Sequence, residues 1–310
     1  MQKRRDFLMQ SATVALGTLL STKNSFASLF NKEGNHALGV QLFTFFNVID
    51  NDVSGTLKSI KGIGYKEIES AFSKKGGYYG MKPKEFASMV KDLGLVWTSH
   101  HVLGAPFKLP PGAKMPVDAS GKPMVLPPMN NLWNNLQQLV DEAAEGGVKY
   151  LVCASTPIDT LDNIYASIDT LNKTGEACKK AGIQLVYHNH DAEFRSVEGK
   201  IPYEMILMQT NADLVKMELD LAWAIKGNKN PVELFQQNPG RFPLWHLKDL
   251  DEKYQSILPV GSGTIDFKPI FEQASLAGMQ HLFVEHDMPA DPLASITGSF
   301  HYIQDKLKAR

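Results

Sequence analysis

The sequence has little of several features that would identify its class directly. Its 310 residues include two cysteines, Cys153 and Cys178, whose spacing fits neither a metal-ligand motif nor a disulfide framework. The net charge is −1, so the chain lacks the basic excess typical of nucleic-acid-binding proteins. No GxGxxG fingerprint follows the first expected strand, which argues against a dinucleotide-binding sheet. What remains is a globular chain of one large or two small domains.

The first 27 residues differ in kind from the rest. A basic start, MQKRRDFL, precedes a moderately apolar run over 12–20 and the small-x-small pattern Ser25-Phe-Ala27. The run is too short to span a bilayer, so we expect a signal peptide over 1–27 and no stable membrane insertion after its removal. Arg4-Arg5 followed by Phe-Leu resembles the twin-arginine export signal, with an ordinary basic signal peptide as the alternative. We therefore expect an exported, periplasmic protein with one domain over 28–310.

From residue 38 onward, apolar runs of strand length alternate with helix-like segments. Strands are expected at 38–43, 66–70, 95–101, 150–154, 183–188, 214–219, 243–247 and 281–285. Helices are expected at 83–93, 132–144, 161–180 and 267–276, before 62–64, and from 231 and 292. Eight expected strands that alternate with helix-like segments predict an α/β protein with a (β/α)₈ TIM-barrel fold, and the open doubly wound sheet is the main competitor.

One connection is longer than the others. Residues 104–128 are rich in proline and follow the third expected strand. In a barrel this loop would lie at the C-terminal rim, where it either closes over a substrate or decorates the surface.

Acidic and imidazole side chains recur where the expected strands end. Alternate residues of a strand point the same way, so His188 and His190 face one space. The C-terminal ends of all strands meet at one rim of a barrel, where active sites of this fold lie. Imidazoles and carboxylates without cysteine are typical of one divalent ion such as Mn²⁺, Zn²⁺ or Co²⁺ rather than of a structural zinc site. The strand-end residues are Glu69, His100, His101, His188, His190, Glu193, Glu218, Asp220, Trp223, His246, Lys248, Asp249, Glu285, His286 and Asp287.

Six stretches together resemble the xylose isomerase-like barrel superfamily, whose members are often described as sugar phosphate isomerases/epimerases. They are LGVQLFTF, YHNHDAEF, ELDLAW, LWHLKDLD, GSGTIDFKPIF and FVEHD, and the resemblance covers nearly all of 28–310. Epimerases of this superfamily hold one metal with Glu, Asp, His and Glu from strands five to eight. The resemblance implies Asp220, His246 and Glu285 as three of these ligands. His188 stands where the first glutamate would be, and Glu193 is the alternative for that place.

The resemblance also implies proton abstraction next to a carbonyl of a small carbohydrate, with the ion polarising an oxygen. The candidates for the base are Glu285, His101 and His190. Lys248 would stabilise an enolate oxygen or bind a hydroxyl group. The indole of Trp223 would either stack on a sugar ring or line the mouth of the barrel. The other expected substrate contacts are Glu69, Glu193 and His286.

These observations predict a divalent-metal-dependent isomerase or epimerase of carbohydrates. Because His188 replaces one of the paired glutamates, a lyase or dehydratase acting on a 3-keto-glycoside or keto-polyol is the first alternative. A sugar-binding barrel without catalysis is the second, although all four ligand positions are filled. Endonuclease IV-like DNA repair is disfavoured by the charge and the export signal, so no nucleic-acid partner is expected. Whether the chain forms a homo-oligomer is left open by the sequence.

Gly261-Ser-Gly263 is a weak signal for a phosphate-binding loop, since two glycines mostly mark a turn. An exported enzyme meets few sugar phosphates. We therefore expect a free sugar, a polyol or an oxidised sugar derivative as substrate.

Overall fold

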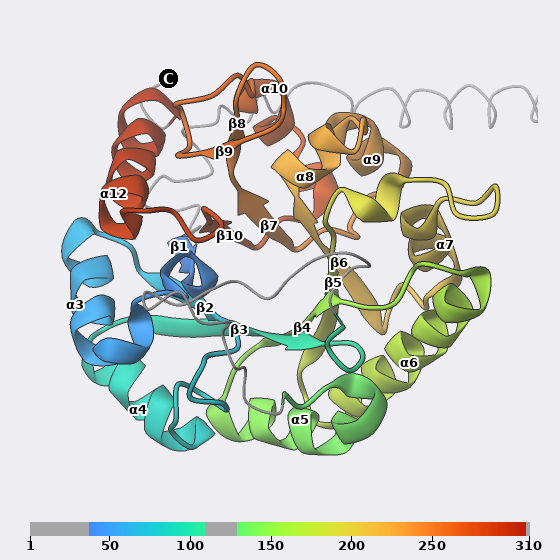
Figure 1. The fold of residues 1–310 in the computed structure, drawn as a ribbon, viewed down its shortest axis with the longest axis horizontal. Coiled ribbons are helices and arrows are strands. Elements are labelled where there is room, and N and C mark those ends of the chain that lie inside the picture. Colours follow the sequence, from blue (N-terminus) through green and yellow to red (C-terminus); the bar gives the residue numbers. More distant parts are fainter. Residues whose placement is uncertain (1–36, 109–128, 308–310) are drawn as a thin grey trace, which may run out of the picture.

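The computed structural model describes residues 37–108 and 129–307. Its centre is a closed barrel of parallel strands in the order β1-β10-β7-β6-β5-β4-β3-β2, which confirms the predicted TIM barrel (Figure 1). The barrel strands are β1 (Leu38–Gln41), β2 (Glu67–Ser70), β3 (Val96–Leu103), β4 (Tyr150–Ser155), β5 (Gln184–His188), β6 (Val215–Asp220), β7 (Leu244–Leu247) and β10 (His281–Val284). A short antiparallel ribbon pairs β8 (Asp249–Leu250) with β9 (Ile257–Leu258).

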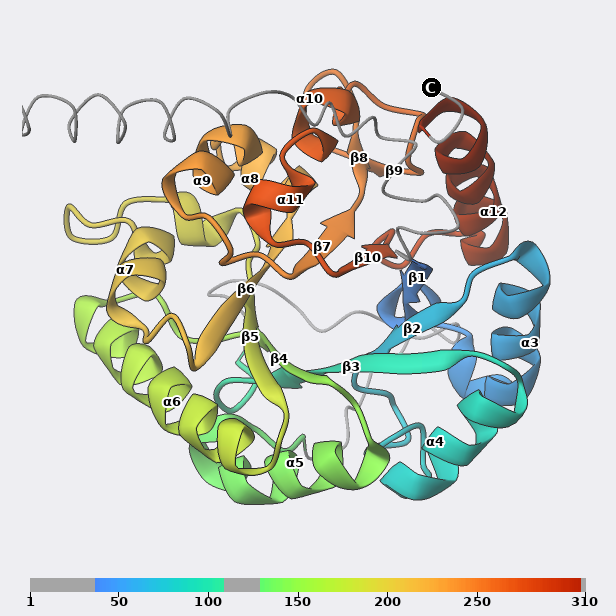
Figure 2. The same cartoon turned by 180° about the vertical axis from the view of Figure 1, so that it is seen from behind.

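Helices form a ring around the barrel, as the two opposite views show (Figures 1 and 2). They are α3 (Val53–Ile63), α4 (Pro83–Asp92), α5 (Leu132–Gly146), α6 (Leu161–Lys180), α7 (Pro202–Gln209), α8 (Leu221–Lys226), α9 (Pro231–Gln237), α10 (Phe267–Phe271), α11 (Ala274–Ala277) and α12 (Pro292–Tyr302). Short turns of helix lie at η1 (Leu42–Phe45), η2 (Ile49–Asn51), η3 (Ala192–Phe194) and η4 (Ile303–Leu307).

Local signals in the sequence set the ends of α6. The hydroxyl of Thr160 accepts a hydrogen bond from the backbone N–H of Asn163 at 3.2 Å, which caps the first turn. Just beyond the last turn, Gly182 has a φ of +76°, a left-handed conformation that glycine adopts without strain. The chain then turns directly into β5. This is why the predicted bounds of the helix match the observed ones.

The interior of the barrel is layered because strand residues alternate between the inner and outer faces. Tyr150, Val152, Val186, Leu244 and Phe283 form one buried apolar cluster inside the barrel. Gly39 leaves space for the ring of Phe283, since a Cβ at residue 39 would lie 2.4 Å from its Cδ1. Two residues further along β5, β7 and β10, the same inward face carries the polar groups of His188, His246 and Glu285. An apolar plug therefore supports a polar layer at the C-terminal end.

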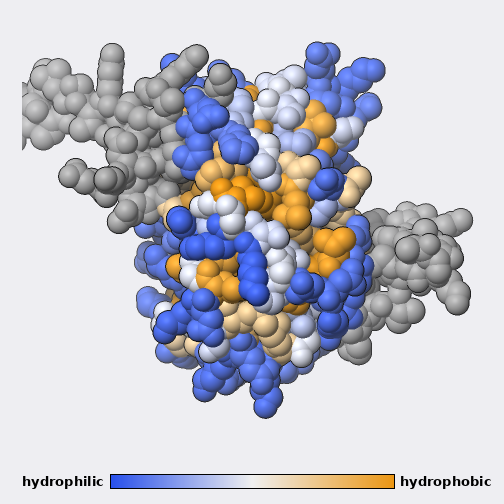
Figure 3. All heavy atoms as spheres, turned by 90° about the vertical axis from the view of Figure 1, so that its left-hand side faces the viewer, coloured by the Kyte–Doolittle hydropathy of each residue, from blue (hydrophilic) through white to orange (hydrophobic). Residues whose placement is uncertain are grey.

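Outward residues of the strands pack against the helices. The ring of Trp245 on β7 stacks on Phe235 of α9 with centroids 4.6 Å apart. Trp97 on β3 meets Phe86 of α4 edge to face at 4.8 Å. On the outer side that carries α3 and α12, apolar patches lie between hydrophilic side chains (Figure 3), a mixture that is ordinary for surface helices.

Two predictions concern segments outside the described residues. The predicted signal peptide over 1–27 lies entirely outside the described residues. The predicted loop over 104–128 lies outside them from residue 109 onward. Within the described ranges, no helix has both the length and the apolar character needed to cross a membrane.

The structure departs from the predicted elements in three regions. Helices α7 and α8 were not predicted, and the expected helix over 267–276 is divided into α10 and α11. The last turns of that helix are held by long-range bonds, because Gly240 N–H and Phe242 N–H donate to the carbonyls of Leu276 and Ala277. The chain entering β7 thus fixes α11, and a local pattern cannot encode this contact.

Candidate functional site

Polar side chains from seven barrel strands meet inside the C-terminal rim. They are buried, with exposed fractions of 6% or less. Each occupies the inward face of its strand or the residue just beyond it, directly above the apolar plug. The group comprises Gln41 of β1, Glu69 of β2, His101 of β3, His188 of β5, Glu218 and Asp220 of β6, His246 and Lys248 at β7, and Glu285 after β10.

The lower part of this group is centred on one carboxylate oxygen. Glu218 Oε2 lies 2.8 Å from His101 Nε2, 3.1 Å from His188 Nδ1 and 3.3 Å from His246 Nε2. Glu69 Oε1 lies 2.6 Å from His246 Nε2 and 3.0 Å from His101 Nε2. Three imidazoles from three strands therefore converge on two buried carboxylates.

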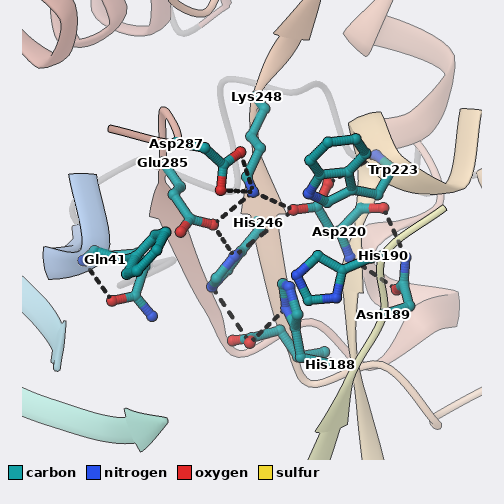
Figure 4. Close-up of polar contacts among 12 residues, drawn as sticks. Gln41, His188, Asn189, His190, Asp220, Trp223, His246, Lys248, Glu285 and Asp287 are labelled. Carbon is teal, nitrogen blue, oxygen red and sulfur yellow. Dashed lines mark hydrogen bonds and ion pairs between the residues drawn. The ribbon is translucent and has the colours of Figure 1, made fainter. Parts of the chain in front are cut away.

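The upper part is centred on the ammonium group of Lys248, which is 1% exposed. Its Nζ lies 3.0 Å from Asp220 Oδ2, 2.8 Å from Glu285 Oε2 and 2.9 Å from Asp287 Oδ2 (Figure 4). Glu285 Oε2 also accepts a hydrogen bond from His246 Nδ1 at 2.8 Å. His246 thus connects the two parts, with one ring nitrogen in each.

Opposite charges stabilise each other in this buried layer. Burial would lower the pKa of His101, but the Glu69 and Glu218 carboxylates outweigh it and raise the pKa to about 9. Burial would likewise lower the pKa of Lys248, and its carboxylate neighbours raise that pKa well above the usual value. Against the effect of burial, the Lys248 ammonium holds the pKa of Glu285 below its usual value. At neutral pH the layer is therefore a network of ion pairs.

His190 and Trp223 lie at the mouth, above the ion-pair network. The ring of His190 lies 4.9 Å from that of His188 and 6.0 Å from the indole of Trp223, centroid to centroid. The His190 side chain is 40% exposed. The Lys248 ammonium lies 5.3 Å from the centre of the Trp223 ring, and Figure 4 shows the indole beside it. These two side chains can contact a molecule that enters from solvent.

Two predicted substrate contacts lie apart from the network. Glu193 accepts hydrogen bonds from the Tyr187 hydroxyl at 3.2 Å and from the backbone N–H of His190 at 3.0 Å. It therefore orients the segment that carries His190. The ring of His286 turns toward α12, where its Nδ1 lies 2.9 Å from the hydroxyl of Ser295.

Glu218 and Asp287 are parts of this site to which sequence reasoning gave no role. Glu218 precedes Asp220 by two residues, so both side chains point into the barrel. That alternate spacing in MELD was the available signal, but the ligand set taken from the resemblance left no position for a second acid on this strand. Asp287 lies beyond the last strand, where its approach to Lys248 depends on the fold.

The loop between β9 and α10 binds the carboxylate of Asp249 on β8. Asp249 Oδ2 accepts the backbone N–H groups of Gly261 at 2.9 Å and Gly263 at 3.0 Å. Its Oδ1 accepts those of Leu250 at 2.9 Å and Ile265 at 3.1 Å. A Cβ at residue 263 would lie 2.4 Å from Asp249 Oδ1, so glycine is needed there. The amides that could bind a phosphate are already occupied.

The donor set fits a divalent metal ion. Two groups have ligand atoms that all lie within 4.8 Å of one another, namely His101, His188, Glu218 and His246, and Asp220, His246 and Glu285. Within the described ranges, Glu69 Oε2, Glu218 Oε1 and Asp220 Oδ2 are buried without a hydrogen-bond partner, and such oxygen atoms could bind a metal ion. Burial lowers the pKa of His188 well below its usual value, so its ring is neutral, the form that ligates metals.

Comparison with known proteins identifies the family. Residues 57–305 match the family model described as xylose isomerase-like TIM barrel, so the chain belongs to this family. An inosose dehydratase of Geobacillus thermodenitrificans is 26% identical over 171 residues, which are 50% of this chain and 55% of that protein. The chain thus spans about half the length of the curated relatives it matches.

Solved structures agree on the fold. One described as a sugar phosphate isomerase/epimerase from Parabacteroides distasonis superposes with a TM-score of 0.70 at 25% identity, covering 94% of this chain and 100% of that one. A structure of L-ribulose 3-epimerase gives a TM-score of 0.63 at 15% identity, covering 88% of this chain and 95% of that one. The second likeness concerns the fold alone.

Proposed function

We propose that this member of the xylose isomerase-like TIM barrel family is a metal-dependent dehydratase of a small cyclic carbohydrate that bears a ketone. The observation that carries the proposal is the contact between the buried side chains of Glu285 and Lys248 at the C-terminal ends of the strands. A carboxylate that can accept a proton lies 2.8 Å from an ammonium group that can stabilise a negatively charged oxygen. These are the two groups that enolisation next to a ketone requires.

In the proposed reaction, Glu285 accepts the proton from the carbon next to the ketone. The electrons of the C–H bond form the enolate, whose oxygen Lys248 stabilises. A hydroxyl group then leaves from the neighbouring carbon, and it takes a proton from the imidazolium of His190 to depart as water. As the hydroxyl group leaves, the enolate electrons re-form the ketone and a new C=C bond, and the resulting enol tautomerises to the dehydrated diketone. Glu285 returns its proton to His190 through solvent.

His190 suits the role of acid. Burial would lower its pKa, but Glu193 outweighs this effect and raises the pKa above the usual value. Its ring borders both the mouth and Trp223, whose indole offers a flat surface for a sugar ring. The bound ion would supply Lewis acidity toward a substrate oxygen. The candidates to hold it are the two ligand groups that share His246.

The choice of a dehydratase over an epimerase rests on two observations. The curated relatives described as inosose dehydratases support loss of water from a keto-polyol. His188 also leaves the site without a second carboxylate at that strand end, which the paired-glutamate mechanism implied by the family resemblance would need. Asp249 fills the amides of the Gly261–Gly263 loop, and this supports a substrate without phosphate.

Isomerisation or epimerisation is the second candidate, favoured by the whole-length likeness to the Parabacteroides distasonis structure. The first step is the same, and the enolate is then reprotonated instead of losing hydroxide. The test incubates the metal-loaded protein in D₂O with inosose and with 3-keto-glucosides, followed by mass spectrometry and NMR. A product lighter by one water supports the dehydratase. A deuterated stereoisomer of unchanged composition supports the second candidate, and absence of both refutes the proposal.

A further inference from the structure

A cavity of about 460 Å³ lies at the N-terminal ends of the barrel strands, opposite the candidate functional site. Its walls come from the starts of β4, β5 and β6, from the residue before β7 and from the C-terminal end of α6. Tyr150 lines the cavity and also belongs to the apolar plug, so the plug separates the cavity from the polar layer at the other rim. Pockets that hold small molecules have volumes of roughly 300–1,000 Å³, and this cavity is within that range.

Three lysines from three different elements line this cavity. Lys149 directly precedes β4, Lys179 lies in the last turn of α6, and Lys216 is the second residue of β6. The Lys149 ammonium lies 5.2 Å from the centre of the Tyr150 ring, and Lys216 donates a hydrogen bond to the carbonyl of Gly240 at 3.3 Å. Within the described ranges, none of the three forms an ion pair with a carboxylate.

The acidic groups at this end do not balance the lysines. Asp213 is the one acidic residue among those that line the cavity, so three positive charges face one negative charge. Glu67, at the start of β2, is already paired, because its Oε2 lies 2.8 Å from Nδ1 of His281. Burial lowers the pKa of Lys216, and the Arg241 guanidinium acts in the same direction. The cavity is therefore a positively charged space.

This charge pattern favours an anion as the occupant. Like charges around one concave space repel one another, and the walls of a cleft concentrate their field on whatever enters it. An anion between the ammonium groups would replace this repulsion by attraction. Ammonium groups on flexible stems bind phosphate and carboxylate groups as point charges, without the fixed fork geometry of a guanidinium. The excess of two positive charges matches a ligand with at least two negative charges.

We propose that this cavity is a second binding site of the protein, for a small organic anion that carries two or more negative charges on phosphate or carboxylate groups. Lys149, Lys179 and Lys216 hold the charged groups, and the volume admits a molecule about as large as a sugar phosphate or a tricarboxylate. The site lies at the opposite end of the barrel from Lys248 and His246. The inference does not depend on the proposed function.

The test titrates pyrophosphate and, separately, citrate into the full chain and follows binding by calorimetry. Metal is first removed with a chelator, so that neither anion binds to a metal ion. The candidate functional site then repels polyanions, because it contains several carboxylates. They belong to Glu69, Glu218, Asp220, Glu285 and Asp287. An ionic strength of about 20 mM keeps the screening of the lysines weak.

The variants are Lys179→Gln and Lys216→Gln, with Lys180→Gln as the matched control. Lys179 and Lys180 are neighbours in the last turn of α6 and both are exposed, but Lys180 does not line the cavity. Circular dichroism checks that each variant is folded. We expect Lys179→Gln and Lys216→Gln each to weaken binding by about threefold to tenfold, and Lys180→Gln by less than about twofold.

Two results would overturn the proposal. One is the absence of binding of either anion up to about 10 mM, which is weaker than a built site would give. The other is equal weakening by Lys179→Gln and Lys180→Gln, which would show a general attraction to the surface. Tighter binding of pyrophosphate than of citrate would support the proposal with a phosphorylated ligand, and the reverse order would support it with a carboxylate ligand.

Discussion

The carboxylate of Asp249 offers a sharp test of how the C-terminal rim is held together. It is 1% exposed and accepts four backbone N–H groups, two on each oxygen. In Asp249→Asn, one oxygen becomes an NH₂ group that faces two N–H donors. Two hydrogen bonds to a charged acceptor are lost, each worth about 1.5–3 kcal/mol, so the variant should lose roughly 3–6 kcal/mol of unfolding free energy.

Urea unfolding at neutral pH, followed by tryptophan fluorescence and circular dichroism, measures the change. Asp266→Asn is the matched control, because Asp266 caps α10 through a single bond to the N–H of Lys268 at 3.1 Å. Asparagine caps helices as well as aspartate, so the control should change stability by less than about 0.5 kcal/mol. A loss below about 1 kcal/mol in Asp249→Asn would refute the four-bond account of the loop.

Four further predictions follow from buried groups. Gly263→Ala should destabilise the protein, because its Cβ would lie 2.3 Å from a backbone carbonyl oxygen, and calorimetry should show a lowered Tm; an unchanged Tm would contradict the packing. Burial raises the pKa of both Cys153 and Cys178 to about 12, so neither thiol should react with a thiol reagent at pH 8 before denaturant is added. Fast reaction of either thiol in the native protein would contradict its burial. Lys248→Met leaves three carboxylates without their cation and should cost about 3–5 kcal/mol of unfolding free energy, whereas wild-type stability would exclude a tight buried network. Glu285→Gln should lower turnover by about 10²–10⁴-fold in a folded protein, and full activity would remove Glu285 from the role of base.

The barrel could be predicted from the sequence because its signals are local. Helix α6 begins after a capping threonine and ends before Gly182, and both effects act within a few residues. The strands are short apolar runs whose alternation already placed His188 and Asp220 on the inner face. Helix α8 escaped prediction because it has six residues and begins directly after Asp220, the N-cap whose side chain was interpreted only as a ligand.

The arrangement inside the rim could be predicted in type but not in detail. Strand-end acids and imidazoles indicated a polar cluster of the kind that the structure contains. Their partners depend on long-range geometry, such as Glu218 with His101, 117 residues away in the sequence. Likewise, Lys248 meets Asp287 only because β7 and β10 are neighbours in the barrel. No pattern of spacing encodes which carboxylate a given cation will contact.

One measurement tests the proposed function most directly. The metal-loaded protein is incubated with 2-keto-myo-inositol, and the products are analysed by mass spectrometry, with chelator-treated protein and Glu272→Gln, an exposed glutamate outside the site, as controls. The proposal predicts a product lighter by one water that forms with metal, disappears with chelator and persists in Glu272→Gln. Recovery of the substrate as a stereoisomer of unchanged mass, or no metal-dependent change with any keto-sugar tested, would contradict it.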